Sequence, residues 1–263
     1  MNLLDRVKKN DVQKRRFPFV VKENALHEEY VNSLLKELPS WDKFHKGQYT
    51  QNHRYQLEAR DILPDNSISP LWRKFVQEHL TQTYWDEVRA LFDLDVFYKK
   101  SFRKIGIRGI DTFATCDVLL DFHIAINTPV TKSSSVRKIH VDMPTQIIAG
   151  LYYLRLEGDD SVGGDLELYE HKGRPIFHKR QFTEDYLVKP FLRIPYQKNT
   201  FVLFPNSVHS LHGVTERMVT PHHRVFVALV ADVKEPLFNP PEENRIMKHV
   251  KYRVPALYKA LRS

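Results

Sequence analysis

The chain has 263 residues, of which 42% are hydrophobic, so it can form one sizeable core, and its composition excludes disordered, collagen-like and coiled-coil classes. A formal net charge of +8 raises the chance of an acidic partner. The basic residues are scattered and no zinc-finger or RNP-type motif accompanies them, which argues against nucleic acid and favours a solvated basic surface. The single cysteine, Cys116, excludes an intramolecular disulfide, the first residues are charged rather than apolar, and no apolar run could span a bilayer. We therefore expect a cytoplasmic protein without a membrane span.

Helices are expected in the first hundred residues. Residues 17–21 (FPFVV) predict a short strand, and residues 25–38 carry apolar side chains at helical spacing before Pro39 ends the helix. Residues 69–92 open with Ser and Pro, as a helix start should, and repeat apolar residues every three to four positions. This spacing indicates a helical segment that packs on a sheet.

From about Thr112 the pattern changes to short runs rich in Val, Ile, Phe and Tyr. The predicted strands are CDVLLDFHIAIN, TQIIAGLYYLRL, DLELYEH, FLRIPY, NTFVLFP and HRVFVALVADV. No regular helices separate them, which favours an antiparallel sandwich or barrel over a parallel α/β sheet. We expect one domain, mostly β with flanking helices: residues 1–111 pack on the core, residues 112–234 form the core, and residues 235–263 form an extension with a short helix at 243–262.

The tripeptide His140-Val141-Asp142 lies just before a predicted strand. Alternate side chains on extended backbone share a face, so both polar side chains could bind one ion. Two histidines and one carboxylate form the facial triad typical of non-haem Fe(II) oxygenases. The dyad alone is weak evidence, because a His and an Asp on a strand are more commonly an ordinary surface pair.

Two further features complete a possible site. The segment NTFVLFPNSVHSLHGV places a histidine at the start of a strand after a turn, and Arg224 begins the next apolar strand. An arginine that points into a barrel is costly to bury without an anion, so a carboxylate that binds it through two hydrogen bonds is the natural partner.

These stretches, taken in order, resemble the 2-oxoglutarate/Fe(II) oxygenase superfamily and specifically its prolyl-4-hydroxylase-like branch. The resemblance is strongest between about Cys116 and Val233 and consists of HVD, GLYYL, GGDLELY, FPNSVHSLHGV and HHRVFV. Each element alone is a weak signal, whereas the five in this order are a strong one. The resemblance implies a double-stranded β-helix, or jelly roll.

The resemblance also implies roles for individual residues. His140, Asp142 and His212 would bind iron, and Arg224 would bind the C5 carboxylate of 2-oxoglutarate. Tyr153 would hydrogen-bond the same carboxylate and Leu166 would line the co-substrate pocket, although both also suit a sheet core. The implied cofactors are Fe(II), 2-oxoglutarate and O2, with ascorbate a candidate reductant.

Several histidines compete for the distal ligand position. His212 is preferred because it is followed by Gly-Val and lies in the F…HG pattern of the branch, whereas His209 precedes it by three residues. His222 and His223 stand too close to Arg224. A structural, hydrogen-bonded role is expected for His123.

The presence of Asp142 favours oxygenation over halogenation, because related halogenases replace this carboxylate with a small residue. We expect hydroxylation of an aliphatic carbon, with succinate and CO2 released. The loop 127–137 suits a polar or anionic substrate, and the candidates are polysaccharide or lipopolysaccharide sugars, small metabolites and prolyl side chains. Alternatives are a catalytically silent jelly roll that binds an anionic ligand, and a Zn(II) hydrolase, which would have no use for Arg224.

Overall fold

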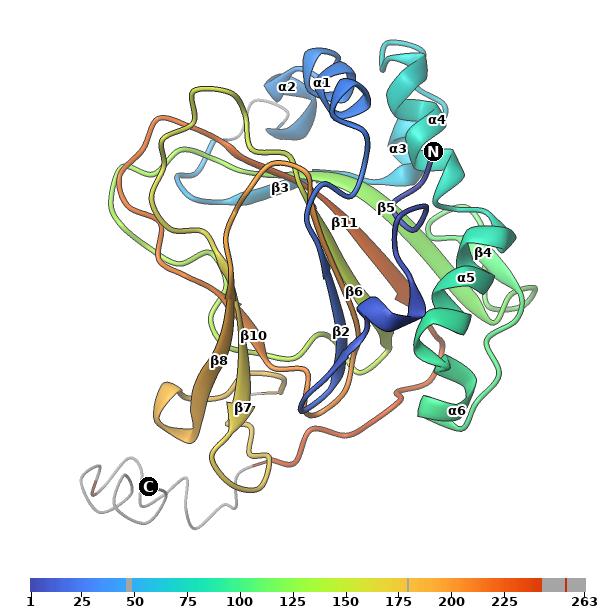
Figure 1. The fold of residues 1–263 in the computed structure, drawn as a ribbon, viewed down its shortest axis with the longest axis vertical. Coiled ribbons are helices and arrows are strands. Elements are labelled where there is room, and N and C mark those ends of the chain that lie inside the picture. The colour runs from blue at the N-terminus through green and yellow to red at the C-terminus, as the bar shows by residue number, and fades with distance from the viewer. Residues whose placement is uncertain (46–48, 179, 243–253, 255–263) are drawn as a thin grey trace.

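A computed structural model describes residues 1–45, 49–178, 180–242 and 254, and its centre is two β-sheets packed face to face (Figure 1). The major sheet has eight strands in the order β1-β2-β9-β6-β11-β5-β3, with β4 added beside β5, and the minor sheet has the order β10-β7-β8. All pairs are antiparallel except β4 with β5. The predicted mostly-β jelly roll with flanking helices is therefore confirmed.

The strands differ greatly in length, from two to ten residues. They are β1 Gln13–Lys14, β2 Pro18–Lys22, β3 Arg54–Leu57, β4 Ile105–Ile107, β5 Val118–Asn127, β6 Gln146–Tyr153, β7 Leu166–His171, β8 Val188–Ile194, β9 Thr200–Pro205, β10 His212–Val214 and β11 Arg224–Asp232. Each strand predicted from the sequence is present. The short β3 and β4, which carry little sequence signal, were not predicted.

The helices are short and lie mostly before β4. They are η1 Lys9–Asp11, α1 Glu28–Lys36, α2 Trp41–His45, α3 Ala59–Ile62, α4 Pro70–Glu78, α5 Gln82–Phe92, α6 Leu94–Tyr98 and η2 Asp185–Leu187. The helical segment predicted over 69–92 is in fact two helices. The second begins anew because the Thr81 hydroxyl accepts a hydrogen bond from the backbone N–H of Tyr84, a helix cap that competes with continuation of α4. The helix predicted over 243–262 lies outside the described residues.

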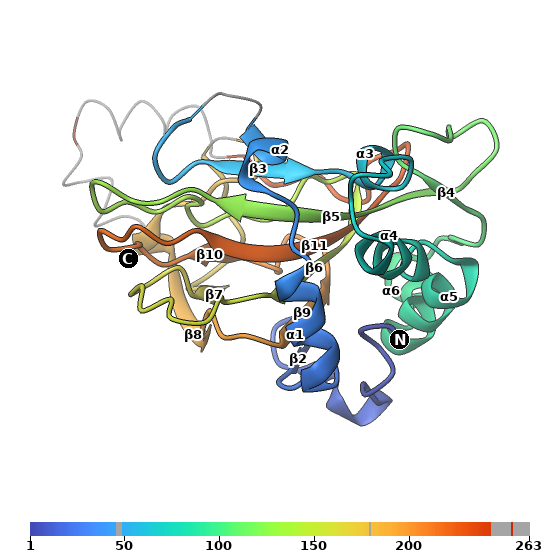
Figure 2. The same cartoon turned by 90° about the horizontal axis from the view of Figure 1, so that it is seen from above.

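The N-terminal part of the chain contributes strands as well as helices. β2 pairs with β9, and β3 pairs with β5, so the two extend the major sheet on opposite sides. Figure 2 shows α4 and α5 on the face of the major sheet that is turned away from β7 and β8, and Val31 and Leu34 of α1 join the same buried cluster as α4. In the described ranges, no helix combines the length and the apolarity needed to cross a bilayer.

The face of the major sheet under the helices, here called the outer face, is apolar. On β5 it carries Phe122, Ile124 and Ile126, which share one large buried cluster with Trp72 and Phe75 of α4. Burial of each such side chain contributes about 1.5–3 kcal/mol, so this layer supplies most of the driving force for folding.

The opposite, inner face looks toward the minor sheet. It contributes a smaller apolar cluster that includes three alanines, Ala125, Ala149 and Ala228, and the rings of Tyr153 and Phe226. From the minor sheet, Leu166, Leu168 and Ile194 join the same cluster. The alanines have short side chains, and polar side chains interrupt this face.

Candidate metal centre

The two predicted histidine ligands come from adjacent segments of the minor sheet. His140 lies opposite His212 at the start of β10, and each backbone N–H donates to the other carbonyl at 2.9 Å. This pairing brings the two imidazole rings to 4.3 Å between centroids. The backbone therefore holds both side chains on one face without help from a metal.

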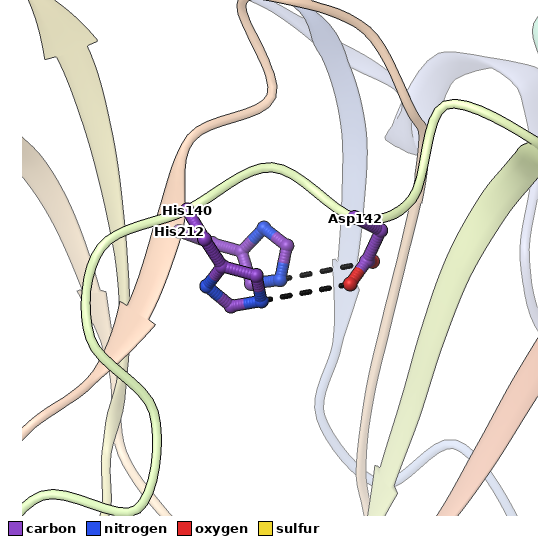
Figure 3. Close-up of side chains that lie close together, drawn as sticks. All are labelled: His140, Asp142 and His212. Carbon is purple, nitrogen blue, oxygen red and sulfur yellow. Dashed lines mark ion pairs between the residues drawn. The ribbon is translucent and has the colours of Figure 1, made fainter. Parts of the chain in front are cut away.

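Asp142 completes the cluster, as Figure 3 shows. Its carboxylate oxygens lie 3.5 Å from Nε2 of His140 and 3.7 Å from Nε2 of His212. One ligand atom from each of the three residues falls within 4.8 Å of the others, and no other such cluster of histidine, cysteine or acidic residues occurs in the described part of the chain. The triad predicted from the sequence is thus assembled in space.

Hydrogen bonds fix which ring nitrogen faces the cluster. Nδ1 of His140 donates to the carbonyl of Lys138 at 2.8 Å, and Nδ1 of His212 donates to that of Ser210 at 2.9 Å. Each Nε2 is therefore the nitrogen that carries a lone pair, which on His140 accepts a hydrogen bond from Nε of Arg137 at 2.8 Å. Such outer hydrogen bonds orient imidazole ligands in metal sites.

The protonation states also suit a metal. Burial, reinforced by the neighbouring His140, lowers the pKa of His212 to about 4, so His212 is neutral at physiological pH. Burial would raise the pKa of Asp142, but its interactions with His212, His140 and Arg137 outweigh burial and hold that pKa well below its usual range. An ionised carboxylate and a neutral imidazole are the forms that bind metal.

A second polar group lies on the inner face, where Arg224 begins β11. The side chain is buried, its Nε donates to the carbonyl of Gly164 at 2.8 Å, and its Nη1 donates to Oδ1 of Asn127 at 3.3 Å. Gly164 has a φ of +81°, and a Cβ there would lie 3.1 Å from Cδ of Arg224. Glycine is therefore required for this close approach.

Four buried donors around Arg224 have no hydrogen-bond partner. They are Nη2 of Arg224, the hydroxyl of Tyr153, Nδ2 of Asn127 and the hydroxyl of Thr200. Strand register places them side by side, because Arg224 is opposite Asn127, and Tyr153 is opposite Thr200 and is beside β11. Burial raises the pKa of Tyr153, although Arg224 opposes the shift, so its hydroxyl stays a donor.

Unsatisfied buried donors without a matching acceptor are costly, and a carboxylate would satisfy them. Three aromatic rings, Tyr153, Tyr196 and Phe226, lie within 5.0 Å of the guanidinium carbon of Arg224 and shield it from water. Asn127 and Thr200 were not singled out in the sequence. The available signal was weak: each is a polar residue at an inward position of an apolar strand.

The remaining predicted residues are placed as follows. Leu166 begins β7 and is buried in the same apolar cluster as Tyr153. His209 is exposed and lies outside the triad, whereas His222 pairs with Asp160 and His223 stacks on Trp41. His123 is buried and hydrogen-bonded to Asp121, in keeping with the structural role expected for it.

No family model matches the chain. No curated protein matches it either. A solved prolyl 4-hydroxylase from Phytophthora capsici superposes with a TM-score of 0.53 over 99% of this chain and 74% of that chain, at 15% identity. The chain has the prolyl 4-hydroxylase fold.

Two further solved structures are similar. A putative oxygenase from Shewanella oneidensis has a TM-score of 0.49 and 11% identity, with 90% of each chain covered. An oxidoreductase of the 2OG-Fe(II) oxygenase family from Burkholderia pseudomallei has a TM-score of 0.42 and 14% identity, covering 86% of this chain and 88% of that one.

Proposed function

We propose that the chain is a non-haem Fe(II)- and 2-oxoglutarate-dependent oxygenase of the prolyl-4-hydroxylase-like branch. The observation that carries this proposal is the presence of two complementary polar groups between the same two sheets. One is a set of metal ligands, and the other is a set of buried donors without acceptors. A metal-dependent hydrolase would use the first group but not the second.

His140, Asp142 and His212 would bind the iron. Two neutral imidazole nitrogens and one ionised carboxylate are the donor set of the facial triad, which leaves coordination positions for a co-substrate. The fixed direction of both Nε2 lone pairs suits this role. When bound, Fe(II) with 2-oxoglutarate and O2 supplies the oxidising chemistry, with succinate and CO2 as products.

Arg224 would bind the C5 carboxylate of 2-oxoglutarate, together with the hydroxyl of Tyr153. Asn127 and Thr200 would complete the donor set, since both carry buried donor atoms without partners. Leu166 would provide the apolar wall beside them. Charge-assisted hydrogen bonds in such a shielded place are about twice as strong as neutral ones.

The carboxylate of Asp142 favours hydroxylation of an aliphatic carbon over halogenation. We propose a small or carbohydrate-like polar substrate, with ascorbate as a candidate reductant. The chain's own contribution is to hold the ligands in place, to orient the co-substrate through Arg224, and to keep water from the guanidinium with the surrounding rings.

The proposal is tested by anaerobic addition of Fe(II) and 2-oxoglutarate to the full chain. We expect the visible charge-transfer band of the iron chelate, and slow succinate formation once air is admitted. Zn(II) in place of Fe(II) is the matched control and should give neither signal. Absence of both the band and succinate with Fe(II) would contradict the oxygenase and favour a silent jelly roll.

A further inference from the structure

Two arginines near the metal centre are not used by the proposed chemistry. Arg137 precedes the first histidine ligand by three residues, and Arg54 begins β3 at the edge of the major sheet. Both side chains are accessible to solvent. Neither forms an ion pair within the described residues, unlike Arg108, which pairs with Asp121 and Asp232.

Arg137 lies directly against the metal ligands. Its Nε donates to Nε2 of His140 at 2.8 Å, which is the atom that would bind iron. Its guanidinium lies 5.8 Å from the ring of Phe182, and that ring in turn stacks on His140. Once Nε2 binds a metal it can no longer accept this hydrogen bond, so the guanidinium becomes available to another acceptor beside the metal.

Arg137 also lines a cleft of about 890 Å³ on the minor sheet, together with Phe182, Lys138 and residues of β7 and β8. The same lining includes four acidic residues, Glu167, Glu184, Asp185 and Glu216, but neither Arg54 nor the three candidate ligands. Pockets of 300–1,000 Å³ are typical of small-molecule sites. The side chain therefore lies between the metal ligands and a space large enough for a substrate.

Arg54 is held in place by a chain of hydrogen bonds across β5. The carboxylate of Asp121 accepts from Nδ1 of His123 at 2.9 Å, which leaves Nε2 of His123 as an acceptor for Nη2 of Arg54 at 2.8 Å. The guanidinium also lies 5.2 Å from the ring of Phe226, on the inner face. His123 thus acts as a positioning residue for Arg54.

The two arginines are close enough to influence each other. Burial among neighbouring atoms lowers the pKa of Arg54 to about 10, and the like charge of Arg137 is the next cause. The Arg54 guanidinium is thus open to solvent and yet closely surrounded by protein atoms, as expected for a side chain on the wall of a recess. The carboxylate of Asp142 acts on both guanidiniums, and once it binds a metal the two cations favour another anion.

Charge balance supports the same conclusion, and here the reasoning rests on the proposed function. In the loaded centre the two charges of Fe(II) offset those of 2-oxoglutarate, and Arg224 offsets Asp142. The charges of Arg54 and Arg137 then remain without an offsetting charge. We propose that Arg54 and Arg137 bind an oxyanion of the substrate, a carboxylate or a phosphate, and thereby direct a nearby carbon toward the metal.

The test uses the full chain loaded with Mn(II), a paramagnetic substitute for Fe(II), and saturating 2-oxoglutarate, which occupies Arg224. The probes are methyl phosphate and propanoate, with neutral propanamide for comparison. Enhanced nuclear relaxation of each probe reports binding close to the metal. We expect saturable relaxation for at least one anion but not for propanamide, and the stronger of the two anions identifies the substrate's charged group.

Arg54→Gln and Arg137→Gln should each weaken binding of that anion about tenfold, the effect of losing one charge-assisted contact. Arg54→Lys, which keeps the charge, should lose less. Arg15→Gln is the matched control, because Arg15 is also exposed and also lies over an aromatic ring, that of Phe191. Water relaxation by bound Mn(II) verifies that each variant still holds metal.

Equal anion affinity in all variants would overturn the proposal, as would an anion that binds only by displacing 2-oxoglutarate from Arg224. The charge-transfer experiment with Fe(II) is independent of these Mn(II) relaxation measurements. Failure of that band in the wild type would reject the oxygenase, whereas a normal band without arginine-dependent anion binding would reject this inference alone.

Discussion

The two faces of β5 differ sharply although they belong to the same ten residues. Toward the helices the strand shows Phe122, Ile124 and Ile126, all buried in apolar contacts. Toward the minor sheet it shows Asp121, His123 and Asn127, which bind other polar groups or carry unpaired donors. Since side chains alternate along a strand, one segment stabilises the fold with one face and forms the site with the other.

The largest effect is expected from substitution of the proposed metal ligands, which should affect the site but not the fold. Asp142→Ala and His212→Ala should each abolish iron retention, because the triad has no spare ligand, while the thermal stability of the metal-free protein changes little. The iron-to-protein ratio after gel filtration measures this. His209→Ala is the control and should retain iron; loss of iron there, with retention in His212→Ala, would transfer the ligand role to His209.

Truncation on the outer face should have the converse effect. Phe122 is fully buried and stacks on His79 at 4.0 Å, so Phe122→Ala is expected to lower the free energy of unfolding by about 3–5 kcal/mol, measured by urea denaturation. The exposed Phe97 provides the control, and Phe97→Ala should cost far less. Loss of iron binding by Phe122→Ala while it is still folded would show that the two faces are not independent.

A smaller effect is expected at the co-substrate pocket. Arg224→Gln should weaken 2-oxoglutarate binding about a hundredfold, equivalent to about 3 kcal/mol for charge-assisted hydrogen bonds, while iron is retained. Tyr153→Phe removes one hydroxyl donor and should weaken binding about tenfold. Titration of the charge-transfer band measures both. Unchanged affinity in Arg224→Gln would show that the carboxylate binds elsewhere.

The smallest expected effect is a change in how the free energy of unfolding depends on pH. Burial lowers the pKa of His79 to about 3, against 6.5 when unfolded, so the unfolded chain binds an extra proton between these values. The stability that the neutral ring contributes is therefore complete above pH 6.5 and declines below it, by roughly 1.4 kcal/mol per pH unit. His79→Leu should reduce this slope by one proton in urea denaturation between pH 6.5 and 5. Identical slopes would mean that His79 titrates normally.

The core strands could be predicted from alternating and continuous apolar runs, because most buried positions of these strands carry an apolar residue. The ligands His140, Asp142 and His212 were found through the order of motifs, and the structure brings them together. Asn127 and Thr200 were missed because only cross-strand register places them beside Arg224. The break between α4 and α5 was missed because the cap at Thr81 competes with a helical pattern that continues through it.

The three alanines on the inner face, Ala125, Ala149 and Ala228, have a consequence for how such a protein can change. Their methyl groups point away from the helices, so a larger residue at any of them would alter the packing between the two sheets rather than the helical layer. Residues between the sheets can then be exchanged one methyl group at a time, in evolution or in engineering, while the outer layer and the candidate ligands are retained.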